Sequence, residues 1–183
     1  MPNALCYVQA PWDKEAILAL ILMSAKCSAS TSAPAVACEA SLAEGNPDQA
    51  IETCSNAIAL NPLDAASHSN RGAAYLFFNM LDKALQDLEI AAKLDQSNPN
   101  TFYNLGVYYD TIKSYEKSIE QYSIVIKLSS GNPIAYFNRA KAFERICRND
   151  EALKDYQKIM EIAPYMAKIR NIPTSINNGC LRG

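Results

Sequence analysis

Six cysteines and one histidine are the side chains of this 183-residue chain best suited to metal binding or nucleophilic chemistry. Zinc sites need such residues at short spacings, Cys-x-x-Cys or His-x-x-x-His, and the sequence contains neither. A glycine-rich phosphate loop and a nucleophile elbow are also missing from the sequence. We therefore expect no catalytic residue, no metal ion and no cofactor, and the sequence does not indicate an enzyme.

Acidic side chains supply general acid–base chemistry only where they converge in a site. The clustered acids of this chain have the spacing of outer helix faces, so we predict that they are solvated and form no paired-carboxylate site. They are Asp82, Asp87, Glu89, Glu116 and Glu120.

The net charge and the length of the apolar runs argue against two classes of partner. Seventeen Lys and Arg against nineteen Asp and Glu give a net charge of −2, which leaves no basic field to displace the counterions of a nucleic acid. No apolar run in the sequence is long enough for a confident membrane span. We expect no nucleic-acid partner, and contact with a membrane only through an uncleaved leader.

The elements that position these residues follow a fixed repeat period, the step from Leu60 to Leu94. Within each period, apolar residues fall at helical spacing in two runs separated by a short break, and Asn-Pro pairs stand between periods. We predict helix pairs over residues 34–60, 65–94, 99–128 and 133–162, hence an all-α repeat architecture. Columns that keep the step are Leu60, Leu94, Leu128 and Ile162; Ile51, Leu85, Ile119 and Leu153; and Ala50, Ala84, Ser118 and Ala152.

These columns resemble the tetratricopeptide repeat family, whose units are about 34 residues long. Its consensus asks for small residues at positions 8, 20 and 27, aromatic residues at positions 4, 11 and 24, and proline at position 32. Val125, Ile159, Gln96 and Ser130 depart from this pattern. The matching residues are Ala50, Ala57 and Pro62 in the first unit; Gly72, Tyr75, Ala84 and Ala91 in the second; Phe102, Gly106, Tyr109 and Tyr122 in the third; and Tyr136, Ala140, Phe143, Ala152, Tyr156 and Pro164 in the fourth.

The resemblance implies a right-handed helical-repeat solenoid of four helix-turn-helix units. In this family the first helices of successive units line a concave groove that grips peptides. The resemblance therefore implies a non-catalytic adaptor for a protein or peptide partner, and it assigns His68 to a packing column. The units are expected over residues 34–64, 65–98, 99–132 and 133–164, followed by a short tail over 165–183.

Position 6 of units two to four carries a row of asparagines, Asn70, Asn104 and Asn138. An amide both donates and accepts, so the row can pair with an extended peptide backbone; alternatively, asparagine merely tolerates solvent there. Tyr103 and Phe137 favour an apolar or aromatic peptide, or else cover the inner seam. The basic clamp of the family's chaperone-tail receptors is expected to be absent. The other groove candidates are Ser69, Val107, Asp110, Lys141 and Arg145.

Arg71 and Arg139 occupy position 7, where the family usually has leucine. An arginine stem covers apolar neighbours while its head reaches a carboxylate. We therefore predict a structural role for both.

Cys38 and Cys54 fall in columns 8 and 24, which face each other within a unit of this family. A disulfide there closes a loop of about 15 residues, worth roughly 3 kcal/mol in the chain-entropy model, provided that the compartment is oxidising. The alternative is two small buried thiols.

The N-terminal leader, residues 1–33, has features of a secretory signal. An apolar run over residues 16–25 precedes a small, polar stretch over residues 27–33, which suits cleavage after Ala33. Asp13 and Glu15 stand where a signal would be cationic, so an apolar helix packed on the array is the alternative. The signal predicts a periplasmic or secreted protein, and its absence a cytoplasmic one.

The C-terminal end lacks an obvious solvating helix, because Pro173 soon interrupts the chain after Pro164. A partly bare terminal face would favour end-to-end contacts between copies. A self-assembling structural subunit is therefore the alternative to a peptide-binding adaptor, and the dependence of assembly on concentration distinguishes the two.

Overall fold

The structure, a computed structural model, describes residues 34–165. The leader predicted over residues 1–33 and the tail beyond Tyr165 lie outside the described residues. Within them every regular element is a helix, which confirms the predicted all-α repeat fold. Between residues 34 and 165 no helix is long and apolar enough to cross a membrane. A helix over residues 34–43 is followed by α2 (Pro47–Leu60), α3 (Ala65–Phe77), α4 (Leu81–Leu94), α5 (Pro99–Thr111), α6 (Tyr115–Leu128), α7 (Pro133–Arg145) and α8 (Asn149–Ile162).

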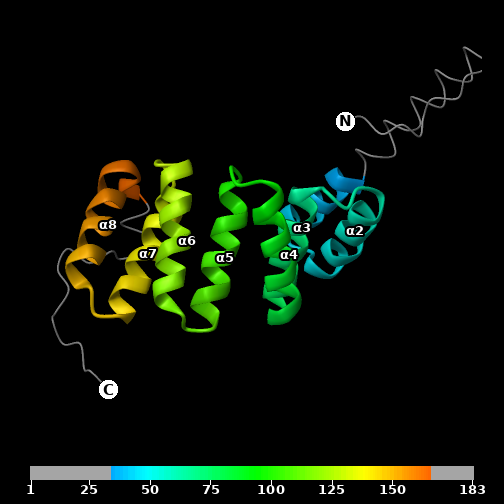
Figure 1. Ribbon diagram of the computed structural model, residues 1–183. Helices are drawn as coiled ribbons and strands as arrows, with labels where there is room; N and C mark the ends of the chain where they lie inside the picture. Colours follow the sequence, from blue (N-terminus) through cyan, green and yellow to red (C-terminus); the bar gives the residue numbers. More distant parts are fainter. Residues whose placement is uncertain (1–33, 166–183) are drawn as a thin grey trace, which may run out of the picture.

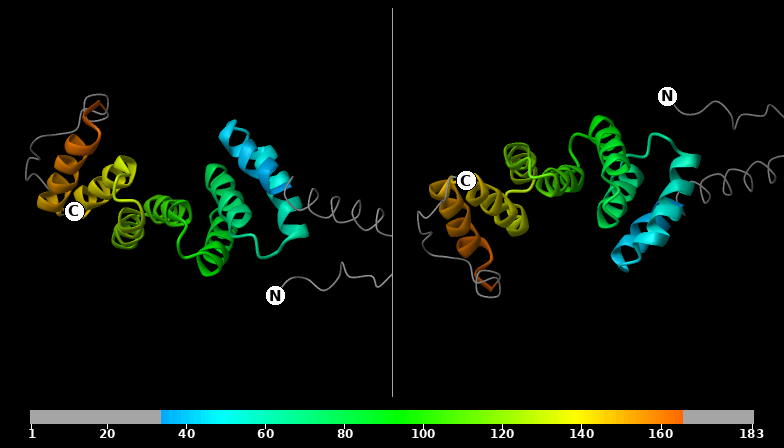
Figure 2. Two further views of the ribbon diagram at one scale, coloured as in Figure 1. Left: turned by 90° about the horizontal axis from the view of Figure 1, so that it is seen from above. Right: turned by 90° about the horizontal axis from the view of Figure 1, so that it is seen from below.

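The helices stand side by side in chain order, so α2 and α8 lie toward opposite ends of an elongated array (Figure 1). The most extensive contacts are within the pairs α3–α4, α5–α6 and α7–α8. From above and below, the helices near the middle are seen almost end-on and those at the ends obliquely (Figure 2). The array is therefore twisted, as stacked helical repeats are.

The turn inside each unit contains a residue in the left-handed region, and these residues keep the repeat period: Gly45, Asn79, Lys113 and Cys147, with φ between 55° and 74°. The following residue bonds back by five, as in Met80 N–H to the Tyr75 carbonyl at 2.9 Å and Ser114 N–H to the Tyr109 carbonyl at 2.8 Å. These are Schellman-type helix ends, for which glycine and asparagine are the usual residues.

The predicted Asn-Pro starts cap two helices. Asn98 Oδ1 accepts a hydrogen bond from Asn100 N–H at 3.0 Å, and Asn132 Oδ1 accepts from Ile134 N–H at 3.0 Å. Pro99 and Pro133 stand at the first helical turn, where a missing N–H costs nothing. Sequence and backbone therefore agree on where α5 and α7 begin.

The core lies where the two helices of a unit cross. Ala50, Ala84, Ser118 and Ala152 are completely buried, as the small column predicted. The glycines of column 8 allow still closer approach: a Cβ added at Gly106 would lie 2.5 Å from Tyr122 Cε1, and one at Gly72 would lie 2.8 Å from Leu88 Cγ. A small residue on one helix thus makes room for a large buried one on the other.

We expect Gly106→Ala to destabilise the protein by about 1–3 kcal/mol, because the buried Tyr122 ring cannot bend away as a flexible side chain can. The measurement is urea unfolding of the full chain. Gly131→Ala is the matched control, since nothing lies within 4 Å of its added Cβ. Equal stability of the two variants would contradict the close approach.

Candidate functional site

The first helices of units two to four, α3, α5 and α7, carry the predicted groove residues. Tyr103, Val107 and Asp110 are spaced along one face of α5, and Phe137, Lys141 and Arg145 along one face of α7. The residues on α5 are half-buried, whereas Lys141 and Arg145 are exposed. The helices α3 and α5 also contact each other directly, so the first helices of units two and three are neighbours.

Two members of the asparagine row, Asn104 and Asn138, connect successive units. Asn104 Nδ2 lies 3.4 Å from Ser69 Oγ and 3.5 Å from the Ser69 carbonyl oxygen, and Asn138 Nδ2 donates to the Tyr103 hydroxyl at 3.1 Å. Each of these contacts reaches back to position 5 of the preceding unit. The amide nitrogens therefore hold the spacing between units. The prediction for Ser69 needs correction, because it is only 1% exposed and supports Asn104 from below the surface.

The two aromatic residues of the predicted groove, Tyr103 and Phe137, are half-buried. The Tyr103 ring centroid lies 5.8 Å from that of Tyr122, and the Phe137 centroid lies 6.2 Å from that of Tyr156. These contacts fall in the range favoured by tilted aromatic pairs. Each ring thus covers a buried tyrosine with part of its surface and keeps another part exposed.

Asp110 is the acidic member of the predicted groove residues. Its carboxylate accepts hydrogen bonds from the hydroxyls of Ser118 and Tyr122, the latter at 2.9 Å. Burial raises the pKa of the Asp110 carboxyl, opposed by those hydrogen bonds and by the positive charge of Arg145. Tyr156 makes the same kind of contact one unit later, donating to Glu144 at 2.9 Å.

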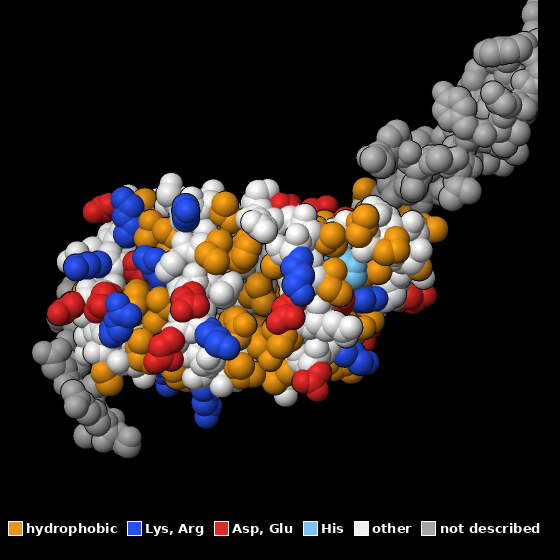
Figure 3. All heavy atoms as spheres, in the orientation of Figure 1, with side chains coloured by type: hydrophobic (Ala, Val, Ile, Leu, Met, Phe, Trp, Pro, Cys, Tyr) orange, Lys and Arg blue, Asp and Glu red, His pale blue; other side chains and the backbone are white. Residues whose placement is uncertain are grey.

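The surface carries no field of one sign on the face that Figure 3 shows. Basic and acidic side chains are interleaved there, with hydrophobic side chains exposed between them (Figure 3). This pattern agrees with the small net charge of the sequence. Recognition on such a face depends on local groups and shape.

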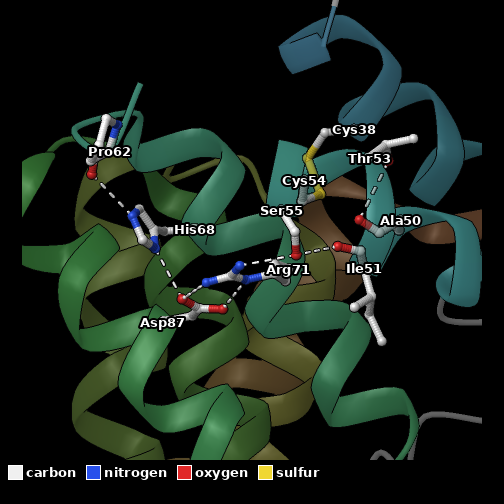
Figure 4. Close-up of polar contacts among 10 residues, drawn as sticks. All are labelled: Cys38, Ala50, Ile51, Thr53, Cys54, Ser55, Pro62, His68, Arg71 and Asp87. Atoms are coloured by element: carbon white, nitrogen blue, oxygen red, sulfur yellow. Dashed lines mark hydrogen bonds and ion pairs between the residues drawn. A yellow bond between two sulfur atoms is a disulfide. The ribbon is translucent and has the colours of Figure 1, made fainter. Parts of the chain in front are cut away.

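Arg71 lies in a polar cluster that joins three helices (Figure 4). Its Nε and Nη2 donate to the two carboxylate oxygens of Asp87 at 2.7 and 2.9 Å, and its Nη1 donates to Ser55 Oγ at 3.0 Å. Ser55 in turn donates to the Ile51 carbonyl at 2.6 Å. Hydrogen bonding to Asp87 raises the pKa of Arg71 above its usual value. The paired geometry is the strong, bidentate form of an ion pair.

A copy of this cluster recurs two repeat periods further along the chain. Arg139 Nε and Nη2 donate to Asp155 at 2.8 and 2.7 Å, and Nη1 donates to Ser123 Oγ at 2.9 Å. Ser55 and Ser123, Arg71 and Arg139, and Asp87 and Asp155 are each separated by two units. The predicted structural role of both arginines therefore agrees with these contacts.

The prediction that Asp87 is solvated is wrong. Asp87 is 3% exposed, and its equivalent Asp155 is 5% exposed. Both carboxylates point inward because each is neutralised by the guanidinium of an arginine on the preceding helix. The identity of three residues at twice the repeat period is the sequence signal that indicates this pairing.

His68 belongs to the same cluster and is 5% exposed. Its Nδ1 lies 2.9 Å from Asp87 Oδ1, and its Nε2 lies 3.1 Å from the Pro62 carbonyl oxygen (Figure 4). Both ring nitrogens are thus engaged within the protein. Among residues 34–165 no group of histidine, cysteine and acidic side chains is arranged to hold a metal ion.

Cys38 and Cys54 lie at the first unit's crossing point (Figure 4). Their sulfur atoms are 2.10 Å apart, their Cα atoms are 4.6 Å apart, and both side chains are completely buried. They occupy the columns that hold Gly72 and Leu88 one unit later. The pair therefore fills the space that a small and a large residue share in the next unit.

Comparison with known sequences gives the class of protein. The sequence profile named "Tetratricopeptide repeat" matches residues 39–100 and 103–167, more than half of the chain. The chain belongs to the tetratricopeptide repeat family, whose members are generally non-catalytic protein–protein interaction modules. No curated protein sequence matches this chain.

Solved structures with the same fold include MamA, at 27% identity and a TM-score of 0.64 over 72% of this chain and 77% of that one. A thermophilic protein of this family from Thermus thermophilus, TTC0263, has 21% identity and a TM-score of 0.67, covering 86% and 87% of the two chains. The first such domain of human RPAP3 has 18% identity and a TM-score of 0.60, covering 66% and 95%. The last two show the fold alone.

We expect Arg139→Leu to destabilise the protein by about 3–5 kcal/mol, because it leaves the buried Asp155 carboxylate without its partner. Adding Asp155→Gln should restore most of the loss, since the pair then copies Leu105 and Gln121, the residues at the same positions of unit three. A double-mutant cycle in urea unfolding measures both effects. A double variant as unstable as the single one would contradict the coupling.

Proposed function

We propose that this protein is an adaptor that binds a peptide or protein segment in the groove formed by α3, α5 and α7. The observation that carries the proposal is the repeated surface of half-buried polar and aromatic side chains along these helices. Asn104 and Asn138 use their amide nitrogens between units, which leaves each amide oxygen to accept from a peptide N–H. Two such acceptors on neighbouring first helices suit an extended chain.

The chemistry of the groove favours an apolar or aromatic side chain on the bound segment. Tyr103 and Phe137 present the exposed parts of their rings, and Val107 lies one turn from Tyr103. Large aromatic surfaces supply much of the binding energy in protein interfaces. Lys141 and Arg145 are exposed on α7 and Asp110 is half-buried on α5, which gives charged groups of both signs for orientation.

The test is a selection of peptides from a random displayed library on the full chain, followed by measured affinities. We expect Val107→Glu to weaken the selected peptides at least about tenfold, because it places an uncompensated charge among apolar contacts. Leu128→Glu is the control, since Leu128 is 41% exposed at the end of α6 and lies outside the groove. Circular dichroism checks that both variants keep their helices.

Unchanged binding to Val107→Glu would contradict the groove. Sedimentation at several concentrations addresses the alternative function. Oligomers that grow with protein concentration, in a chain that selects no peptide, would favour the self-assembling subunit in place of the adaptor.

We also propose that the protein is exported and that the Cys38–Cys54 disulfide is formed in its native compartment. The proposal rests on the apolar run and cleavage pattern of the leader, and on two buried cysteines whose Cα distance of 4.6 Å suits a disulfide. A disulfide would also stabilise the unit that lacks the aromatic residues of the others.

The measurement is the intact mass of natively isolated protein, with and without reductant and alkylation, followed by peptide mapping. We expect a chain that begins near Pro34 and peptides linked through Cys38 and Cys54. A full-length chain with fully alkylated cysteines would overturn both parts and favour a cytoplasmic adaptor.

A further inference from the structure

A pocket of about 360 Å³ opens at the junction between units two and three. It lies between α4, α5 and α6, and its lining includes Glu89, Lys93, Leu105, Tyr109 and Gln121. The helices at this junction, α4 and α5, contact each other less extensively than α2 and α3 or α6 and α7 do. The central junction is therefore the open one of the three.

The repeat register shows what this pocket lacks. Shifting Glu89, Leu105 and Gln121 by one repeat period in either direction gives the members of the two arginine clusters. At the outer junctions a guanidinium fills this position and bonds to a serine and an aspartate. At the central junction Leu105 replaces the arginine, so no guanidinium occupies this position. The equivalent residues are Ser55, Arg71 and Asp87 on one side and Ser123, Arg139 and Asp155 on the other.

We propose that this pocket binds an arginine side chain supplied by a partner protein. The acceptors that an arginine requires are still present, because Glu89 stands in the place of the serine and Gln121 in the place of the aspartate. At the outer junctions the carboxylate is the aspartate, whereas here it belongs to Glu89 on α4. The amide oxygen of Gln121 on α6 remains as a second acceptor. A guanidinium, with its fork of donors, matches such a pair better than an ammonium does.

An aromatic ring completes the same environment at all three junctions. The guanidinium carbon of Arg71 lies 5.9 Å from the centroid of the Tyr75 ring, and that of Arg139 lies 5.8 Å from the centroid of Phe143. Tyr109 has the equivalent position at the central junction and lines the pocket. A bound guanidinium therefore finds the cation–π contact that both internal arginines already make.

The pocket is large enough to admit an arginine side chain. Ala92 lines it where the outer junctions have Ile58 and Ile126, so the smaller residue adds space. A volume of about 360 Å³ is near the lower limit for small-molecule sites. The pocket therefore has room for an arginine side chain projecting from a partner.

Outside the lining, the Lys117 ammonium lies 5.4 Å from the centroid of the Tyr109 ring. Lys93 is the one lining group whose charge opposes a cation. The same position at the junction of units three and four is Lys127, and Arg139 nevertheless forms its ion pair there. A lysine at this position is exposed at both junctions and can turn its ammonium toward water. Lys93 therefore weakens the site without excluding a guanidinium.

The pocket is separate from the groove of the proposed function. Leu105 is turned about 200° around α5 from Tyr103, at 3.6 residues per turn. Leu105 and Tyr109 thus lie on the side of α5 opposite Tyr103 and Val107. The two sites can be occupied together, and the pocket does not depend on a peptide in the groove.

The experiment is a titration of the full chain with N-acetyl-arginine methylamide, followed by amide chemical shifts in NMR spectra. The neutral isostere N-acetyl-citrulline methylamide and the blocked lysine are the comparison probes. We expect shifts confined to α4, α5 and α6 around the pocket, saturating on the order of millimolar for so small a probe. Citrulline should give no saturating shift, and lysine should bind more weakly than arginine.

Two variants test the assignment of the acceptor and of the vacant place. Glu89→Gln changes an exposed side chain and should weaken the arginine probe roughly two- to fivefold, while Lys93→Ala should strengthen it. The triple variant Glu89→Ser, Leu105→Arg, Gln121→Asp copies the outer junctions, fills the pocket with its own guanidinium and should abolish binding.

Equal shifts with arginine and citrulline, shifts scattered over the surface, or unchanged affinity in Glu89→Gln would each overturn the proposal. The single variant keeps the test decisive even where the triple variant fails to fold.

Discussion

The close crossing of two helices within each unit is the constraint on which the rest of this structure depends. Gly72 against Leu88 and Gly106 against Tyr122 leave no room for an added Cβ, so a small residue must face each large one. The completely buried Cys38 and Cys54 occupy the same two columns in the first unit. Because every unit crosses in this way, its turn must reverse the chain within a few residues, and a left-handed residue recurs once in every repeat period.

Successive units are joined by a different kind of interaction. At two junctions a buried bidentate pair, Arg71 with Asp87 and Arg139 with Asp155, crosses from one helix to the next and reaches a serine of the preceding unit. A buried pair of this kind contributes less to net stability than to fixing one arrangement, since either partner alone is costly. The central junction has neutral residues in its place and looser helix contact.

The helix α5 presents a different surface on each of its two sides. Tyr103 and Val107 lie on the side proposed to bind a peptide, and Asn104 lies beside them and bonds to Ser69. Leu105 and Tyr109 line the pocket behind. An α-helix turns 100° per residue, so positions two apart point nearly opposite ways. One rigid element thereby holds these two surfaces at a constant distance.

The sequence alone determined the period, the helix pairs, the Asn-Pro starts and the small columns, because these depend on local propensity and on spacing along one chain. It also placed Cys38 opposite Cys54 and gave both arginines a structural role. Tertiary structure alone decided the burial of Asp87 and the bonds of Asn104 and Asn138 to the preceding unit. In each case the deciding partner lies on another helix, and its hydrogen bonds outweigh the preference of the polar side chain for water.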